Sequence, residues 1–281
     1  MWLPWRDAVW LALGLAVVAT VMRVRVPPSR RLWVRDLAQE GAILSILYAT
    51  WQLVGHLSGG AADNAVIRGR AIVSVERTLR LPSEEWAQHV ALHSHLIIKA
   101  ANWYYIVGHT PVIGVFLVWL YLRHRPDFAR WRTVLAVGTI VGELIQLFPV
   151  APPRFALFYI VDTMREYGPR VYSDDGAGFA PQLAAMPSLH CVWAITVGVA
   201  VFRVVKSPWR WIGPAHAVAT VLVVVITGNH YWLDAAAAIP LVLLGLGVAA
   251  TTAYLSRRRL GETAEALASP ASPASPAEVV S

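Results

Sequence analysis

Long uncharged stretches alternate with short charged segments along most of the chain. Five of these stretches contain no Asp, Glu, Lys or Arg: 41–62, 100–122, 176–202, 211–233 and 235–256. Each is long enough to cross a bilayer as a helix, which takes roughly 20 residues. The pattern therefore predicts an all-α protein, built as a polytopic bundle of membrane-spanning helices.

Two further stretches extend this bundle. Residues 133–153 are apolar except for Glu143, and residues 8–22 form an uncharged run of 15 residues. A run this short also fits a signal peptide, which is removed from the mature protein. Arginines follow the run here instead of preceding it, and "VMRVRVPPSRR" offers no small-residue cleavage site. We therefore expect six core transmembrane helices plus an extra one at the N-terminus.

Basic residues mark one side of the predicted bundle, because they gather in four of the segments between spans. They are Arg23, Arg25, Arg30, Arg31 and Arg35, then Arg123, Arg125, Arg130 and Arg132, then Arg203, Lys206 and Arg210, and last Arg257, Arg258 and Arg259. These segments fall in every second gap, as is typical of cytoplasmic loops. The N-terminus is then outside, the C-terminus is cytoplasmic, and the other loops face the extracytoplasmic side.

Composition supports a membrane protein and argues against a nucleic-acid partner. The chain has 281 residues, of which 57% are hydrophobic and 15% charged, whereas a soluble domain carries about 25% charged residues. The formal net charge is +7, but no soluble basic face is present through which it acts on nucleic acid.

The same pattern divides the chain into three parts. We expect N-terminal transmembrane helices over 1–62, a membrane domain of an amphipathic segment and five spans over 63–260, and a disordered cytoplasmic tail over 261–281. The tail contains "ASPASPASPA", a proline-rich sequence with too little apolar surface to fold.

The segment 63–99 is expected to be amphipathic. Its apolar residues Ile72, Val73, Val75 and Leu79 are spaced as on one face of a helix. Such a helix lies along the membrane surface with its apolar face in the lipid.

Polar residues converge at the predicted extracytoplasmic ends of three spans. Arg154 follows "FPVAPP", Ser188 and His190 open the span that starts at "MPSLH", and "GNHYWLD" places His230 and Asp234 four residues apart. Residues at this spacing share one face of a helix. Since polar groups at membrane depth are costly, their convergence favours a functional site.

These residue types suit phosphoryl chemistry. Arg154 offers a permanently charged fork for phosphate oxygens, and the helix start at Ser188 exposes backbone amides that favour an anion. Asp234 is suited to hold one ring nitrogen of His230 while the other attacks phosphorus, and His190 is suited to protonate the departing oxygen.

Each residue also has a simpler interpretation. A histidine at a helix end is commonly a hydrogen-bonded interface residue, an arginine after prolines commonly meets lipid headgroups, and an aspartate at a span start is commonly a cap. A metal site is a further alternative for His190, His230 and Asp234, although Arg154 beside them repels a cation. The histidines of "HVALHSH" have spacings that resemble a second metal site, but solvated histidines on a surface helix are the favoured interpretation; they are His89, His93 and His95. We therefore expect no metal and no cofactor.

The motifs "APPR", "MPSLH" and "HYWLD", in this order at the ends of successive spans, resemble the type 2 phosphatidic acid phosphatase superfamily. Within it they are most similar to the branch of inositol phosphorylceramide synthases and other inositolphosphotransferases, with sphingomyelin synthases more distant. The resemblance covers the chain from about Glu76 to the last span.

The resemblance implies a role for each motif residue. His230 becomes a phosphohistidine, Asp234 activates it, His190 acts as general acid and then base, and Arg154 and Ser188 grip the phosphoryl group. It also implies catalysis without a metal ion.

The chain departs from the phosphatases of the superfamily at three positions. Leu147 and Val224 stand where they have a lysine and an arginine, and Leu189 stands where they have the glycine of PSGH. The candidates for additional phosphate contacts are Lys99, Arg165, Arg170 and Asn229. The missing cations favour the transferase-like branch.

The sequence thus predicts an integral membrane enzyme that transfers a phosphorylated headgroup from a phospholipid or isoprenoid-type lipid to an alcohol. A lipid phosphate phosphatase that uses water as the acceptor is the alternative. A non-catalytic transporter or scaffold is a third, with His109 and Glu143 as its candidate polar residues within the membrane. The sequence indicates no oligomeric state.

Overall fold

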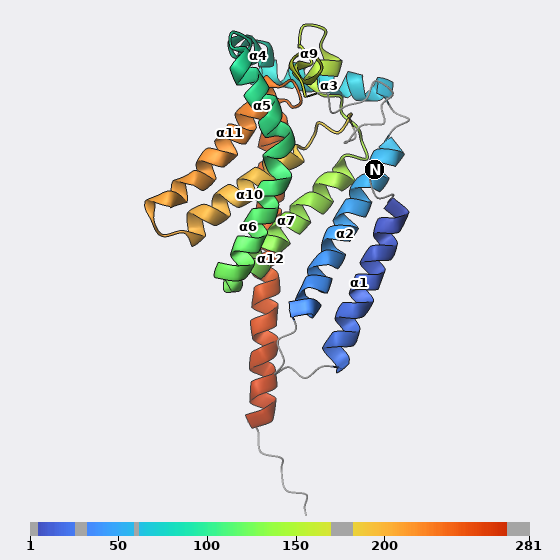
Figure 1. Ribbon diagram of the computed structural model, residues 1–281, viewed down its shortest axis with the longest axis vertical. Coiled ribbons are helices and arrows are strands. Elements are labelled where there is room, and N and C mark those ends of the chain that lie inside the picture. The colour runs from blue at the N-terminus through green and yellow to red at the C-terminus, as the bar shows by residue number, and fades with distance from the viewer. Residues whose placement is uncertain (1–4, 26–32, 59–61, 170–181, 269–281) are drawn as a thin grey trace, which may run out of the picture.

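The computed structural model describes residues 5–25, 33–58, 62–169 and 182–268. Over these residues the chain forms helices joined by turns, with an isolated parallel bridge between Val150 and Ala184 and no named strand. Figure 1 shows long helices running side by side, with short helices across one end. The expected all-α class is confirmed for the described residues.

The helices follow one another in a simple order along the chain. They are α1 (Trp5–Arg25), α2 (Trp33–Ser58), α3 (Ala62–Thr78), α4 (Glu84–Leu92), α5 (His95–Val107), α6 (His109–Arg123), α7 (Arg125–Ile145), α8 (Pro153–Ala156), α9 (Thr163–Tyr167), α10 (Leu189–Val204), the 3₁₀ turn η1 (Pro208–Trp211), α11 (Ile212–Ile226) and α12 (Trp232–Ala268).

Two helical stretches of the described chain are each long and apolar enough to cross a membrane. They are Pro208–Ile226, which joins η1 to α11, and Trp232–Glu262 within α12. The pair α5 and α6 makes a third if it is taken as one span bent by 51°. The protein is therefore a membrane protein, whereas the full set of six core spans and an N-terminal one stays a prediction.

The bend between α5 and α6 divides the uncharged stretch 100–122, which the sequence pattern presents as one span. The break lies at Gly108, and Pro111 sits in the first turn of α6. Because proline has no amide hydrogen, it cannot bond to the carbonyl of Val107, as a straight helix requires.

The stretch 176–202 is not a single helix either. Of its described residues, 182–188 are non-helical and α10 begins only at Leu189. The backbone before α10 pairs with the segment after α7: Val150 donates to Leu183 O at 2.8 Å and accepts from Ala185 N at 3.1 Å. The uncharged stretch is thus longer than the helix, which begins at the "MPSLH" motif.

The amphipathic segment 63–99 is also divided. It forms α3, α4 and the first turn of α5, where one surface helix was expected. Figure 1 shows α3 lying across the end of the bundle. Val73 is buried against the bundle, while Val75 and Leu79 are exposed.

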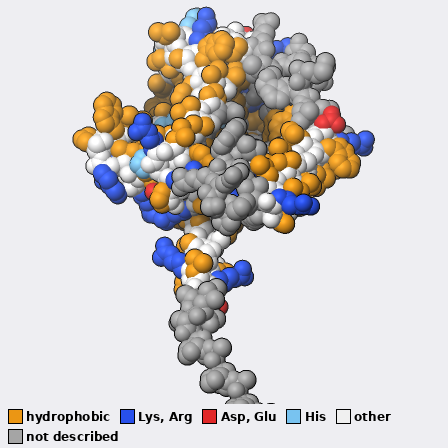
Figure 2. All heavy atoms as spheres, turned by 60° about the horizontal axis from the view of Figure 1, so that its bottom comes forward, with side chains coloured by type: hydrophobic (Ala, Val, Ile, Leu, Met, Phe, Trp, Pro, Cys, Tyr) orange, Lys and Arg blue, Asp and Glu red, His pale blue; other side chains and the backbone are white. Residues whose placement is uncertain are grey.

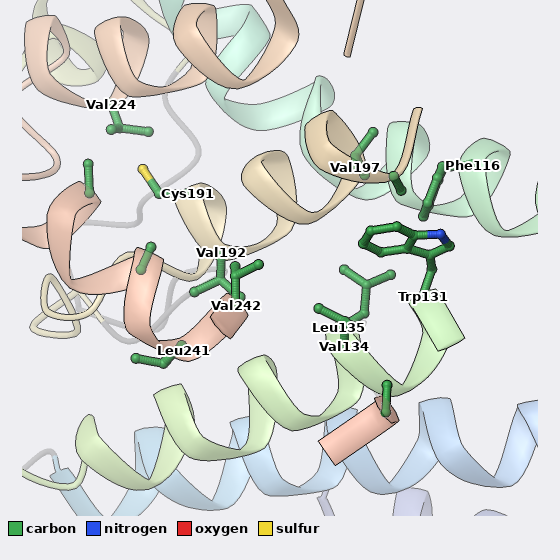
Figure 3. Close-up of a cluster of buried hydrophobic side chains, with 14 of the residues drawn as sticks. Phe116, Trp131, Val134, Leu135, Cys191, Val192, Val197, Val224, Leu241 and Val242 are labelled. Carbon is green, nitrogen blue, oxygen red and sulfur yellow. The ribbon is translucent and has the colours of Figure 1, made fainter. Parts of the chain in front are cut away.

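The main core lies between α6, α7, α10, α11 and α12 (Figure 3). Its largest buried side chain, Trp131, projects from α7. A methyl group on Gly138 of α7 would lie only 2.7 Å from Val192 Cγ1 of α10, so small residues let these helices approach closely, as in other membrane bundles. This packing fixes α10 and α12 relative to α7.

The hairpin of α1 and α2 attaches to this core through ion pairs. Arg125 Nη2 lies 2.5 Å from Asp36 Oδ2, and Arg132 Nη1 lies 2.5 Å from Glu40 Oε1. Both contacts join α2 to α7. The division of the chain at residue 62 stays a prediction.

The bundle has two ends of different character. We call the end that carries α3, α4 and α9 the site end, and the opposite end, where α6 meets α7 and α10 turns into α11, the basic end (Figure 1). The described residues of the four basic clusters belong to segments at the basic end. Figure 2 brings this end forward and shows Lys and Arg side chains around it.

Candidate active site

A tight turn between α11 and α12 presents the third motif. Gly228 adopts a φ of +71°, a conformation in which a side chain is strained. The amides of Asn229 and His230 both donate to Val224 O, at 3.2 and 3.0 Å. The turn ends where α12 starts, at Trp232, so His230 lies directly before the first turn of that helix.

His230 and Asp234 are buried and in contact. His230 Nδ1 lies 3.2 Å from Asp234 Oδ2 and 2.8 Å from the carbonyl oxygen of Ala185. The same Asp234 oxygen accepts from Tyr231 N at 2.9 Å. Since both partners of Nδ1 are acceptors, Nδ1 carries the proton and Nε2 is left with a lone pair. Asp234 and the carbonyl of Ala185 therefore leave Nε2 of His230 as the unprotonated ring nitrogen.

His190 faces this pair from the first turn of α10. The ring centroids of His190 and His230 are 5.6 Å apart, and Tyr105 of α5 lies 4.5 Å from His190 and 6.4 Å from His230. Tyr105 belongs to none of the three motifs, so its position beside both histidines was not foreseen. The two imidazoles are close enough to act on one small group.

Ser188 caps α10 and ties it to α12. Its Oγ accepts from Cys191 N at 3.3 Å, and its own amide donates to Asp234 O at 3.3 Å. The first amides of a helix have no partner within the helix, so the amides of Leu189 and His190 stand at an anion-favouring terminus. The structure thus brings the second and third motifs together.

Arg154 joins the same site from α8. Its backbone amide donates to Gly228 O at 3.1 Å, and its Nη1 donates to Asn229 Oδ1. Its Nε lies 3.6 Å from Asp162 Oδ2, and its side chain is 3% exposed. The guanidinium is therefore fixed beside the histidine turn. Asp162 is a contact that the sequence did not indicate.

Two buried amide side chains hold the segment that carries Asp162. Gln88 of α4 donates to Val161 O at 2.9 Å and accepts from Val161 N at 2.8 Å. Asn102 of α5 accepts from Thr163 Oγ1 at 2.7 Å. An amide in an otherwise apolar stretch is a signal for such a contact, but its partner becomes visible only in the fold.

The residues that the sequence suggests as additional phosphate contacts lie in different places. Asn229 lies in the site through Arg154. Lys99 is exposed on α5, and Arg165 is exposed on α9, where its amide donates to Asp162 Oδ1 at 3.2 Å. Arg170 lies outside the described residues.

The histidines of "HVALHSH" are exposed. His89 and His93 meet edge to face with ring centroids 4.8 Å apart, and His95 lies 5.3 Å from Tyr167. Within the described residues, no group of three or more His, Cys, Asp or Glu side chains has an arrangement suited to a metal ion.

Two of the three departures from the phosphatase motifs are buried in apolar contacts. Leu189 is buried on α10, and a methyl group on Gly142 of α7 would lie 2.5 Å from its Cδ2. Val224 is fully buried in the core, and Leu147 is partly exposed. Leu189 therefore serves the packing of α7 against α10.

Comparison with known proteins identifies the family of this chain. A family model described as the PAP2 superfamily matches residues 70–248, which is more than half of the chain. No curated protein and no solved structure gives a significant match. The matched range contains Arg154, Ser188, His190, His230 and Asp234. The chain therefore belongs to the PAP2 superfamily and is a phosphatase-type membrane enzyme that acts on lipids.

Proposed function

We propose that the protein transfers a phosphorylated headgroup from a membrane lipid to an alcohol through a phosphohistidine at His230. The observation that carries this proposal is the contact of His230 Nδ1 with Asp234 and the carbonyl of Ala185, which leaves Nε2 as the nucleophile beside His190.

The reaction has two balanced steps. In the first, His230 Nε2 forms a bond to phosphorus, the bond from phosphorus to the lipid oxygen breaks, and protonated His190 gives its proton to that oxygen. In the second, neutral His190 takes the proton of an acceptor alcohol, whose oxygen bonds to phosphorus and releases His230. Asp234 stabilises the positive charge that develops on the imidazole ring.

Two features of the site support the phosphoryl group during both steps. The Arg154 guanidinium pairs with its oxygens, and the amides at the start of α10, capped by Ser188, favour its negative charge. The mechanism needs no metal ion and no cofactor, because Arg154 and the α10 terminus supply the electrostatic stabilisation.

The charge of the site favours a phosphodiester donor. A phosphodiester carries a single negative charge, whereas a phosphate monoester carries about −1.5 to −2 at pH 7. Arg154 is already paired with Asp162, and Leu147 and Val224 add no positive charge. Transfer of a headgroup from an inositol phospholipid-like donor fits this balance better than dephosphorylation of a monoester.

The second candidate is hydrolysis by the same covalent route, with water in place of the alcohol. Membership of the PAP2 superfamily favours it. The two functions differ only in the acceptor of the second step, so one assay separates them.

The test uses purified protein with ³²P-labelled phosphatidylinositol, with and without a short-chain lipid alcohol whose product differs in mass. We expect labelled product only when the alcohol is present, and an acid-labile label on the protein when it is absent. His230→Ala is expected to lose both signals. His89→Ala, which changes an exposed histidine outside the site, is the matched control and is expected to keep them. Release of labelled inositol phosphate, with no labelled lipid product when the alcohol is present, would show hydrolysis instead.

A further inference from the structure

Two glutamates outside the motifs are buried at the site end. Glu76 lies in the last turn of α3 and Glu84 is the first residue of α4, and they are 3% and 5% exposed. Glutamate is almost never buried to this degree unless it is paired.

Glu76 contacts the helix that carries Asp234. Its Oε1 accepts a hydrogen bond from the backbone amide of Leu233 at 2.8 Å. Leu233 is the second residue of α12, so its amide is among those that have no partner within the helix. Glu76 therefore caps α12 from a different element. The capped turn also contains Asp234, whose Oδ2 holds both Tyr231 N and His230 Nδ1.

One further oxygen of each glutamate lacks a hydrogen-bond donor. Glu76 Oε2 and Glu84 Oε1 are both buried, and neither meets a donor among the groups around it. The two carboxyl groups are neighbours, because Glu84 raises the pKa of Glu76 both as a hydrogen-bond partner and as a nearby negative charge. One proton therefore satisfies both oxygens, whereas two ionised carboxylates leave them facing each other.

The charges around this pair are acidic. The groups that act on Glu76 are Glu84 from α4 and Asp234 from α12. Tyr231 lies in the turn before α12. Burial raises the pKa of its hydroxyl group, and so do the nearby acidic groups Asp234, Glu84 and Glu76 together with Tyr159 of the α8–α9 segment. On α3 itself, Arg77 is exposed and its Nη2 donates to Tyr159 Oη at 3.3 Å.

Burial and the neighbouring Glu84 raise the pKa of Glu76 from 4.5 to about 9. Glu76 therefore keeps its proton at neutral pH and loses it in alkaline solution. The loss places a second negative charge beside Asp234 and sets two carboxylates against each other at the junction of α3, α4 and α12.

We propose that Glu76 and Glu84 share one proton, and that this protonated pair positions the His230–Asp234 pair by capping the first turn of α12. The part of this inference that concerns turnover rests on the proposed function. Glu76 is a positioning residue, because it acts through Leu233 N and makes no contact with the reacting atoms.

The catalytic test compares two variants of Glu76. In Glu76→Gln, the amide oxygen still accepts from Leu233 N and the amide nitrogen donates to Glu84, but the side chain at position 76 no longer titrates. We expect its kcat at pH 7 to stay within about threefold of the wild type, and the alkaline limb of its pH profile to move upward by one pH unit or more. In Glu76→Ala we expect kcat to fall roughly 10- to 100-fold with KM within about threefold, since the cap is lost while the phosphate-binding groups stay.

Glu85→Gln, an exposed neighbour, is the matched control and should change neither kcat nor the pH profile. If Glu76→Gln were as inactive as Glu76→Ala, or kept the wild-type alkaline limb, the proposal would be overturned.

A second measurement is independent of turnover. The folded pair keeps a proton that the unfolded chain releases near pH 4.5, so the folded state binds more protons between about pH 5 and 9 and its stability falls as pH rises through that range. We expect the melting temperature of the wild type in detergent to fall over this range, and the slope to be smaller in Glu76→Gln.

The two measurements separate the two proposals. If the wild type shows no lipid turnover but Glu76→Gln flattens the slope, the proposed function fails and the shared proton stands. If turnover is present but Glu76→Gln leaves both the slope and the alkaline limb unchanged, the shared proton fails and the proposed function stands.

Discussion

Arg154 contacts two acceptors of different charge, the neutral amide oxygen of Asn229 and the carboxylate of Asp162. A phosphate group that enters the site competes with Asp162 for the same guanidinium. Asp162 also caps α9, because its Oδ1 accepts from Arg165 N. Asparagine is an equally good cap, so the charge of this residue is separable from its structural part.

We predict that Asp162→Asn tightens inhibition by vanadate or inorganic phosphate. The change removes a negative charge beside Arg154 while the α9 cap is retained. Partly exposed charge pairs of this kind contribute about 1 kcal/mol, or roughly fivefold in binding. Inhibition constants measured on the purified enzyme check this expectation. Asp127→Asn at the basic end is the control, and a weaker inhibition in Asp162→Asn would contradict the argument.

At this scale the sequence led to the motif residues but not to their neighbours. Arg154, Ser188, His190, His230 and Asp234 are of types that suit phosphoryl chemistry, and the alternation of spans and basic loops puts them at one end. The structure brings them together; their roles stay predictions. The contacts of Glu76 and Tyr105 join elements distant in sequence, and that of Asp162 crosses an irregular loop, so no spacing along the chain encodes these pairings. Asp162 contacts Arg154, Glu76 contacts the backbone amide of Leu233, and Tyr105 lies beside His190 and His230.

Among the elements, α7 and α10 set the position of the second motif. Leu189 fills the space above Gly142, where a methyl group would come within 2.5 Å of its Cδ2. The two positions therefore share one volume, and a change at either is felt at the other.

We predict that Leu189→Ala and Gly142→Ala compensate each other. Leu189→Ala leaves a cavity that costs roughly 2–5 kcal/mol, and Gly142→Ala overpacks the same contact at a cost of roughly 1–3 kcal/mol. The double variant is expected to be more stable than the sum of the two effects by about 1 kcal/mol or more. Thermal unfolding in detergent measures all three variants.

Gly114→Ala provides the control for this cycle. Gly114 lies within α6, and a methyl group there meets nothing within 4 Å. We expect its stability to equal or slightly exceed that of the wild type, because alanine favours helix. Strict additivity at Gly142 and Leu189 would show that the two residues do not share the contact.

The elements themselves were predicted in kind more than in extent. Hydrophobic runs locate membrane helices well, because a chain segment in lipid must bond its backbone groups internally and so forms a helix. They do not show where such a helix bends, because apolar side chains that face lipid and those that face the core look alike in sequence. The "MPSLH" motif marked the start of α10, but the run 100–122 hid the bend at Gly108. That bend follows from a proline, to which a hydropathy pattern is insensitive.

On the scale of the whole molecule, the separation of the two ends determines where substrate is met. The basic clusters lie at the end opposite α3, α4 and α9 (Figure 1). If that end faces the cytoplasm, as positive charge favours, the site faces the extracytoplasmic side.

We predict that this orientation is visible by cysteine labelling. The native Cys191 is fully buried, so the wild type gives little background. Glu85→Cys on α4 is expected to react with a membrane-impermeant maleimide on intact cells, and Arg130→Cys on α7 only after permeabilisation. Both native side chains are exposed. The reverse labelling pattern would place the site on the cytoplasmic side.

The length of α12 has a practical consequence. Its 37 residues extend about 56 Å at 1.5 Å per residue, nearly twice the hydrocarbon thickness of about 30 Å. The helix that carries Asp234 in its first turn therefore continues well past the lipid at the opposite end. It is a rod that links the two sides mechanically, so a fluorophore placed on its distal turns reports changes in helix tilt at the site without touching the chemistry.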